Sequence, residues 1–306
     1  DNEQALKIFD MASAFGHRVA DPVPGMFSFT AGSETAKGGM LHGCAEGGEL
    51  IPKARLSVKL DAPPLDDGGG NGGDGKSKRR ARSLPKYSGP IVVECDRVTG
   101  SAALRLSSIA ARQLHGSTPF DLHLHLAPDV GSVEAVEGTL LDPSSDHRLA
   151  NDVASESCPL LHREIDYDDY DVDAGQFRRI EAPMAPRALW RNLCRRASIP
   201  PTARWGDVPD KKIRALAHLT VDCPLRITGV RPPVDDDDGG AEFATSGGVS
   251  LREIDMTTTE SKLCDGLFFC GTGVLDVHGF HGGFNSLASL STGYLAGRNA
   301  AAKACQ

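Results

Sequence analysis

A glycine-rich stretch early in the chain carries the residue types and spacing of a phosphate-binding loop. Residues 68–77, GGGNGGDGKS, fit G-x-x-x-x-G-K-[ST] at 70–77 and G-x-G-x-x-G at 68–73. In a working loop of either kind, a buried strand leads into the glycines and a helix begins after them. Here APPLDD precedes the loop and is no buried strand, while KSKRRARSLPK continues it and offers no apolar helical face. We therefore expect residues 66–84 to form a flexible surface insertion without a nucleotide.

A second glycine-rich stretch, 271–285, matches neither pattern but has suitable surroundings. Its sequence, GTGVLDVHGFHGGFN, follows an apolar run at 266–271 that predicts a short buried strand. Gly271 and Gly273 would let the backbone turn and approach a ligand, and the pair 282–283 stands where the last helix begins. Free N–H groups at a helix start favour a phosphate or an electron-rich ring oxygen. The residues alone leave two interpretations equally open: a ligand site, or a tight turn with no ligand.

Histidine and cysteine residues supply the remaining candidates for chemistry. His278 and His281 lie in the second glycine stretch, where one could relay protons; a surface position is the alternative. His123 and His125 lie two apart on one predicted strand face, which suits a metal pair, but no third ligand has recognisable spacing. Cys270 falls in the predicted buried strand, where core packing is its expected role. No elbow motif supports a Ser/His/Asp nucleophile.

Composition argues against several classes of protein. The 306 residues carry a net charge of −8 and only 6% aromatic residues, which is unsuited to a general nucleic-acid surface. A basic cluster at 76–82 could still contact RNA or act as a nuclear address. No run of eighteen apolar residues occurs, so we expect no membrane span. The eight cysteines form no C-x-x-C pair, which predicts reduced thiols and a soluble, intracellular protein.

Hydrophobic periodicity predicts a mixed α/β chain. The region 130–217 has the texture of a helical insertion, and its acidic run at 166–173 is expected to be a solvated loop. Small residues dominate the last helix and should let it pack tightly on a sheet. Helices are expected at 3–15, 101–114, 133–142, 184–199, 209–219 and 282–304, and strands at 54–60, 89–95, 120–129, 220–231 and 266–271.

The C-terminal part of the chain carries several motifs in a fixed order. They are ATSGGV (244–249), ESKL (260–263), LDVHGFHGGFN (275–285) and TGYLAG (292–297). This set closely resembles the C-terminal part of the BaiN/YhiN-like flavoproteins, also called aminoacetone-oxidase-like. Further passages at 16–29, 99–108, 188–199 and 218–231 resemble the same family more loosely. The resemblance is dense after residue 218 and patchy over the rest of the chain.

The resemblance implies a partial Rossmann-like FAD-binding domain that is split by a β-rich domain. Residues 1–30 and 245–306 would form the FAD-binding domain. The β-rich domain would span 31–129 and return at 218–244, and it would carry the helical insertion at 130–217.

The resemblance also implies FAD as the cofactor, NAD(P)H as the electron donor and an unidentified small molecule as the substrate. Asp276 would accept from a ribityl hydroxyl of FAD. Asn285 would either donate to the edge of the flavin ring or cap the start of the last helix. The residues expected at the cofactor are Thr245, Gly247, Gly248, Gly271, Thr272, Gly273, Leu275, Asp276, Gly282, Gly283, Phe284 and Asn285.

Three departures from the family pattern bear on activity. The family begins with a strand, a G-x-G-x-x-G turn and an acidic ribose ligand, whereas this chain begins at Asp1, so we expect an N-terminal truncation. The family's G-E-x-L-D is GTGVLD here (271–276), without the acidic contact. Its T-H-x-G-x-S-G-P is ECDRVTGS (94–101), without the histidine and the proline. The alternative function is therefore an inactive remnant that serves as a binding or scaffold module, with RNA as its candidate partner.

Overall fold

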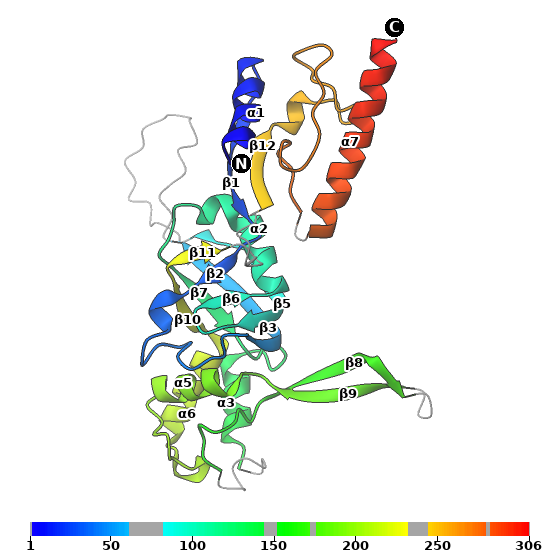
Figure 1. The fold of residues 1–306 in the computed structure, drawn as a ribbon. Helices are drawn as coiled ribbons and strands as arrows, with labels where there is room; N and C mark the ends of the chain where they lie inside the picture. Colours follow the sequence, from blue (N-terminus) through cyan, green and yellow to red (C-terminus); the bar gives the residue numbers. More distant parts are fainter. Residues whose placement is uncertain are drawn as a thin grey trace, which may run out of the picture. The chain divides into compact units, whose positions relative to one another are not determined.

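The protein forms two compact units in the computed structural model of Figure 1. The first unit comprises Asp1–Ser28, Ser107–Gly116 and Arg231–Gln306, and the second comprises Phe29–Leu106 and Ser117–Val230. The mixed α/β class predicted from periodicity is confirmed. The glycine patterns at 68–77, the basic cluster up to residue 81 and His281 lie outside the described residues. The structure describes residues 2–60, 82–143, 152–171, 176–231, 244–279 and 282–305.

An eight-stranded sheet forms the centre of the second unit. Its strand order is β10-β7-β3-β5-β6-β2-β11, and β4 pairs with β3 outside this path. Alternating apolar residues explain the pairing, since Leu122 and Leu124 of β7 are buried opposite Val58 and Leu56 of β3. The strands are β2 (Ser28–Thr30), β3 (Glu49–Leu60), β4 (Arg82–Ser83), β5 (Tyr87–Val93), β6 (Arg97–Thr99), β7 (Phe120–His125), β10 (Cys223–Ile227) and β11 (Gly229–Arg231).

Short helices complete the second unit and bury its two tryptophans. Trp190 and Trp205 are almost fully buried, with ring centroids 6.5 Å apart, and the indole N–H of Trp190 donates to the Ala154 carbonyl at 2.9 Å. This unit therefore has a closed apolar core. The helices are α3 (Val133–Leu141), α5 (Arg187–Arg196) and α6 (Asp210–Val221), with 3₁₀ turns η1 (Gly32–Glu34) and η2 (Trp205–Asp207).

The region predicted as a helical insertion also contains a long hairpin. Strands β8 (Leu161–Asp171) and β9 (Gln176–Pro183) pair in antiparallel fashion and extend from the rest of this unit (Figure 1). The prediction of a loop for the acidic run 166–173 is therefore wrong for residues 166–171. Backbone pairing with β9 outweighs the charge pattern there, and Tyr167 and Tyr170 within the run have high strand propensity.

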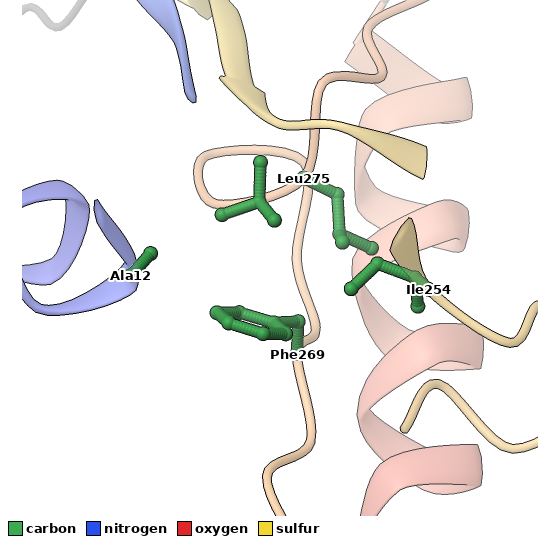
Figure 2. Close-up of a cluster of buried hydrophobic side chains, with 5 residues drawn as sticks. Ala12, Ile254, Phe269 and Leu275 are labelled. Carbon is green, nitrogen blue, oxygen red and sulfur yellow. The ribbon is translucent and has the colours of Figure 1, made fainter. Parts of the chain in front are cut away.

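The first unit contains both ends of the chain and the last turns of helix α2 (Ser101–Leu114). Its elements are α1 (Asn2–Ala14), β1 (Val19–Gly25), β12 (Ala244–Val249), the 3₁₀ turn η3 (Leu251–Glu253) and α7 (Gly282–Ala304). Strands β1 and β12 pair in antiparallel fashion, and Val249 forms a parallel bridge with Leu275. A small cluster of Ala12, Val249, Ile254, Phe269 and Leu275 forms its core (Figure 2).

Three local predictions are wrong. Residues 266–271 form no strand: within the described part of the chain, their one β-bridge is an isolated antiparallel bridge between Phe268 and Glu260. Helix α7 has the predicted bounds, but in the described part of the chain nothing lies within 4 Å of a Cβ built on Gly293 or Gly297, so those glycines mediate no tight packing. Finally, β4 pairs with β3 and Leu84 is buried, so the end of the predicted insertion 66–84 is ordered sheet.

Candidate functional site

The beginning of the second glycine stretch is a turn held by helix α7. Gly271 has a φ of +91°, and its carbonyl accepts from Val274 and Leu275 N–H at 3.1 and 2.9 Å. The N–H of Gly271 donates to Thr292 Oγ1 at 3.0 Å, and that of Thr272 donates to Ser289 Oγ at 3.1 Å. Glycine is required at 271 for its positive φ. The backbone N–H groups of Gly271 and Thr272 are thus used within the protein.

The glycines of the ATSGGV motif allow β12 to lie tightly between two backbone segments. Gly247 and Gly248 have φ values of +121° and +130°. A Cβ on Gly247 would collide with the carbonyl oxygen of Asp21, and one on Gly248 with that of Val274. Val249 N–H donates to the Val274 carbonyl at 2.8 Å, and Asp276 N–H donates to the Val249 carbonyl at 2.9 Å. The motif therefore fixes where Asp276 lies.

Helix α2 holds the next part of this stretch, residues 276–279, from one side. Ser108 Oγ donates to the Gly279 carbonyl at 2.8 Å, and His278 Nε2 donates to the Ser108 carbonyl at 2.8 Å. A carbonyl can only accept, so Nε2 carries the hydrogen and Nδ1 is the acceptor of the neutral ring. Arg112 Nη2 donates to Asp276 Oδ1. Ser108 and Arg112 lie four residues apart and so share one face of α2.

Helix α7 braces the same segment through Asn285. Its Oδ1 accepts from the Gly279 N–H at 2.8 Å, and its Nδ2 lies 3.5 Å from Met26 Sδ. A Cβ on Gly279 would collide with the ring of Phe284, so glycine is required for this close approach. Asn285 therefore neither caps its own helix nor points freely outward. It fixes the conformation of 276–279.

A pocket of about 350 Å³ opens beside this segment, within the first unit. It brings together a carboxylate, a guanidinium, an imidazole, a hydroxyl and an amide on a partly apolar wall. Ser246 is buried, whereas the side chains of Asp276 and Arg112 are 28% and 46% exposed. Such a set can hydrogen-bond a hydroxylated ligand from several directions. The lining residues are Ile109, Arg112, Gln113, Ser246, Asp276, Val277 and His278.

The structure thus brings together only some of the predicted site residues. Asp276 and His278 line the pocket, and Asn285 supports them. Gly247 and Gly248 shape the backbone beside it, and Leu275 is buried in the core. Gly271 and Thr272 are held by α7, and Thr245 pairs with Pro24 in the sheet of β1 and β12. Gly282, Gly283 and Phe284 form the start of α7, where Phe284 is 43% exposed.

Sequence reasoning missed Ser108, Arg112 and Gln113. The sequence of α2 gave one signal, because Arg112 and Gln113 are adjacent polar residues at the end of the helix. The local sequence does not show that this end of α2 contacts residues 276–279. That contact is tertiary, since Arg112 and Asp276 are 164 positions apart in the chain.

The histidine pair of β7 serves structural contacts in the second unit. His125 Nε2 donates to the Gly131 carbonyl at 2.8 Å, and Nδ1 accepts from Ala127 N–H at 3.2 Å, so neither nitrogen is left for a metal. His123 Nδ1 lies 2.5 Å from Asp222 Oδ1. In the part of the chain that the structure describes, no three His, Cys, Asp or Glu residues are grouped to hold a metal ion.

A buried Ser and a buried His lie in a row with a partly exposed Glu in the first unit. His17 Nε2 is 2.9 Å from Ser261 Oγ, and His17 Nδ1 is 3.3 Å from Glu253 Oε2. Ser261 Oγ also accepts from the N–H groups of Leu263 and Cys264, at 3.0 and 2.8 Å. The Ser261 hydroxyl oxygen accepts two backbone hydrogens and belongs to a buried residue, so it is a poor nucleophile, and this row ties the loop 253–264 to the start of β1.

The cysteines offer no reactive centre at the site. Cys270 is exposed, which corrects its predicted place in the core, and the chain there lies against α1 around a mostly apolar pocket of about 250 Å³. Burial raises the pKa of the Cys158 and Cys223 thiols to about 12, which makes them inert. All eight cysteines are free thiols.

Fold and site together define a mixed α/β protein with a polar pocket beside a glycine-rich turn and the start of a long helix. The family model of the HI0933-like protein Rossmann domain matches residues 5–299. The chain therefore belongs to the HI0933-like family, which agrees with the resemblance to BaiN/YhiN-like flavoproteins and makes it a member of a Rossmann-type flavoprotein family.

One curated relative supports this placement over a short stretch. The 3-dehydro-bile acid delta(4,6)-reductase of Clostridium scindens is 48% identical over 56 residues, which are 18% of this chain and 13% of that protein. The match therefore spans only a small part of the relative's length. Among the described residues, no helix is both long and apolar enough to cross a membrane.

Proposed function

We propose that the protein is an FAD-dependent oxidoreductase that takes electrons from NAD(P)H and reacts with a small molecule still to be identified. The observation that carries this proposal is the match to the HI0933-like Rossmann family over residues 5–299. The pocket adds support, because its polar wall at residues 276–278 belongs to the motif on which the flavoprotein resemblance rests.

The donors and acceptors of the pocket fit the ribityl and ring end of FAD. The ion pair with Arg112 uses Oδ1 of Asp276, so Oδ2 can accept from a ribityl hydroxyl. The hydroxyl of Ser246 adds a second polar group. A volume of about 350 Å³ suits one part of such a cofactor. The proposal concerns only the ribityl and ring end of FAD.

The start of α7 and His278 would act on the ring of the bound flavin. When bound, FAD supplies the electron transfer itself. The N–H groups of Gly282 to Phe284, at the positive end of the α7 dipole, would face the pyrimidine oxygen of the ring. His278 would accept a proton at Nδ1, because its Nε2 hydrogen is held by the Ser108 carbonyl.

Two observations refine the proposal. The relative's name describes a reductase, which supports reduction of the substrate; its bile-acid substrate is not carried over, because the match covers 13% of that protein. The eight free thiols support a reducing, intracellular compartment.

The first test substitutes the start of α7. Gly283→Val places a branched side chain where the ring would approach the backbone, and we expect FAD binding to weaken about tenfold or more, which corresponds to about 1.4 kcal/mol. Gly293→Val is the matched control, because it makes the same change farther along α7 in open space. FAD released from equal amounts of protein is measured by absorbance, and circular dichroism checks the fold.

A second measurement tests the reaction. Protein loaded with FAD should oxidise NADH or NADPH, and the bleaching of flavin absorbance without oxygen reports the electron transfer. Equal FAD occupancy in Gly283→Val and the parent would show that the turn is only structural. A parent protein that neither carries nor takes up FAD would contradict the proposed function.

A further inference from the structure

The last turns of helix α2 present a charged side chain, Arg112, to the pocket. Arg112 and Ser108 share one face of the helix, and Ser108 already fixes the backbone at Gly279 with a hydrogen bond of 2.8 Å. Arg112 thus projects from a helix that is anchored to the pocket wall. Such anchoring limits the positions its guanidinium can take.

Arg112 determines how Asp276 is presented. Its Nη2 donates to Oδ1 of the carboxylate, and the two side chains remain 46% and 28% exposed, so a ligand can still reach them. A carboxylate has two oxygens that each accept hydrogen bonds. With Oδ1 held by a charge-assisted bond, Oδ2 is the oxygen that meets a ligand, in a fixed direction.

The charge balance of the pocket favours an uncharged ligand group. Arg112 and Asp276 neutralise one another, and His278 is the one other titratable group among the lining residues. A free carboxylate would repel the electron-rich parts of a cofactor, and a free guanidinium would attract phosphate. The pair does neither, and it offers an acceptor suited to hydroxyl groups.

We propose that Arg112 is a positioning residue that holds Asp276 so that its free oxygen accepts hydrogen bonds from the ribityl chain of the flavin. This inference rests on the proposed function, because it assumes that a flavin occupies the pocket. It adds a residue outside the motifs on which the flavoprotein resemblance rests. It also gives α2 a role in ligand binding.

Two flavins that differ only in the side chain at N10 separate this role from a merely structural one. Riboflavin carries the ribityl chain, and lumiflavin carries a methyl group in its place. Dissociation constants for both are measured with the full chain by quenching of flavin fluorescence. Arg112→Ala should weaken riboflavin binding about tenfold, the cost of one charge-assisted hydrogen bond, and leave lumiflavin binding unchanged.

Matched variants complete the experiment. Arg105→Ala removes an exposed arginine from the same helix and should change neither constant. Arg112→Lys keeps the charge and should recover part of the riboflavin affinity. In an Asp276→Ala background, Arg112→Ala should have no further effect, because the arginine acts through the carboxylate.

The outcomes distinguish the two proposals. Unchanged riboflavin binding in Arg112→Ala, equal weakening of both flavins, or additive effects of the two substitutions would overturn the role of Arg112 and leave the flavin site standing. A parent chain that binds neither flavin would overturn both.

Discussion

The two units of the protein differ in where their large apolar side chains lie. The largest fully buried side chains of the described residues all belong to the second unit, among them Trp190, Trp205 and Phe29. Most of the large apolar side chains that are exposed belong to the first unit. On α7 alone these are Phe284, Leu287, Leu290 and Tyr294, with Leu290 73% exposed, and on α1 and directly after it they are Ile8, Met11 and Phe15.

The difference shows two ways of holding a unit together. The second unit closes an eight-stranded sheet and its helices around its own core. The first unit has a two-stranded sheet, and hydrogen bonds from backbone N–H groups to the side chains of Ser261, Thr292 and Asn285 hold its loops in place. Units with few buried apolar contacts open more easily, and ligand sites are often found there.

The largest effect should come from the second unit's core. Trp190→Ala removes a fully buried side chain and its hydrogen bond to Ala154, so we expect a loss of about 3 to 5 kcal/mol in the free energy of unfolding. Leu290→Ala, on the exposed stripe of α7, should change it by less than about 0.5 kcal/mol. Urea unfolding followed by circular dichroism measures both. A comparable loss in Leu290→Ala would mean that the stripe is covered in solution, and the contrast between the units would be lost.

The second-largest loss of stability should come from substituting a glycine of the first unit. Gly248→Ala puts a Cβ against the Val274 carbonyl at a φ of +130°, and we expect it to destabilise the first unit by about 2 kcal/mol. Both tryptophans lie in the second unit, so tryptophan fluorescence reports on that unit. The fluorescence transition should stay in place while amide hydrogens of β1 and β12 exchange faster. A matching shift of the fluorescence transition would show that the two units unfold together.

Ser261→Ala should have a smaller effect on the same unit. It leaves the N–H groups of Leu263 and Cys264 without their acceptor and removes the partner of His17, so we expect a loss of about 1 to 2 kcal/mol. Ser286→Ala, at an exposed position of α7, is the control. Hydrogen exchange of the loop 253–264 measures the change. If exchange there matches the parent, the Ser–His–Glu row does not hold the loop.

The smallest effect should be a pH-dependent one near the C-terminus. The hydrogen bond from Lys303 lowers the pKa of the Glu260 carboxyl below its usual range. A lowered folded-state pKa adds stability above the unfolded pKa and loses it as pH falls through the folded one. Lys303→Met should therefore lower the melting temperature slightly at neutral pH, with the two proteins converging in acid. Because both side chains are partly exposed, high salt should also reduce the difference in melting temperature. If the difference in melting temperature between Lys303→Met and the parent persists in acid and in high salt, packing of the lysine stem accounts for it instead.

The sequence by itself determined the class of the fold, the family and most helices. Strong periodicity gave α2 and α7 their observed bounds, since an amphipathic or small-residue helix is encoded over neighbouring positions. The ordered motifs after residue 218 indicated the family that the chain belongs to. Local sequence failed where pairing decides, as for the acidic strand β8 and for residues 266–271.

Only the tertiary structure decided what surrounds Asp276. The pocket joins α2, β12 and the segment before α7, which lie far apart in the sequence, and its contacts depend on backbone positions set by Gly248 and Gly279. The role of Asn285 also depends on the fold, because its side-chain oxygen accepts from the backbone N–H of Gly279 across a turn. Arg112 is an ordinary helix residue until folding places it against a carboxylate 164 positions away. A pattern along the chain encodes neighbours in sequence, whereas a site is made of neighbours in space.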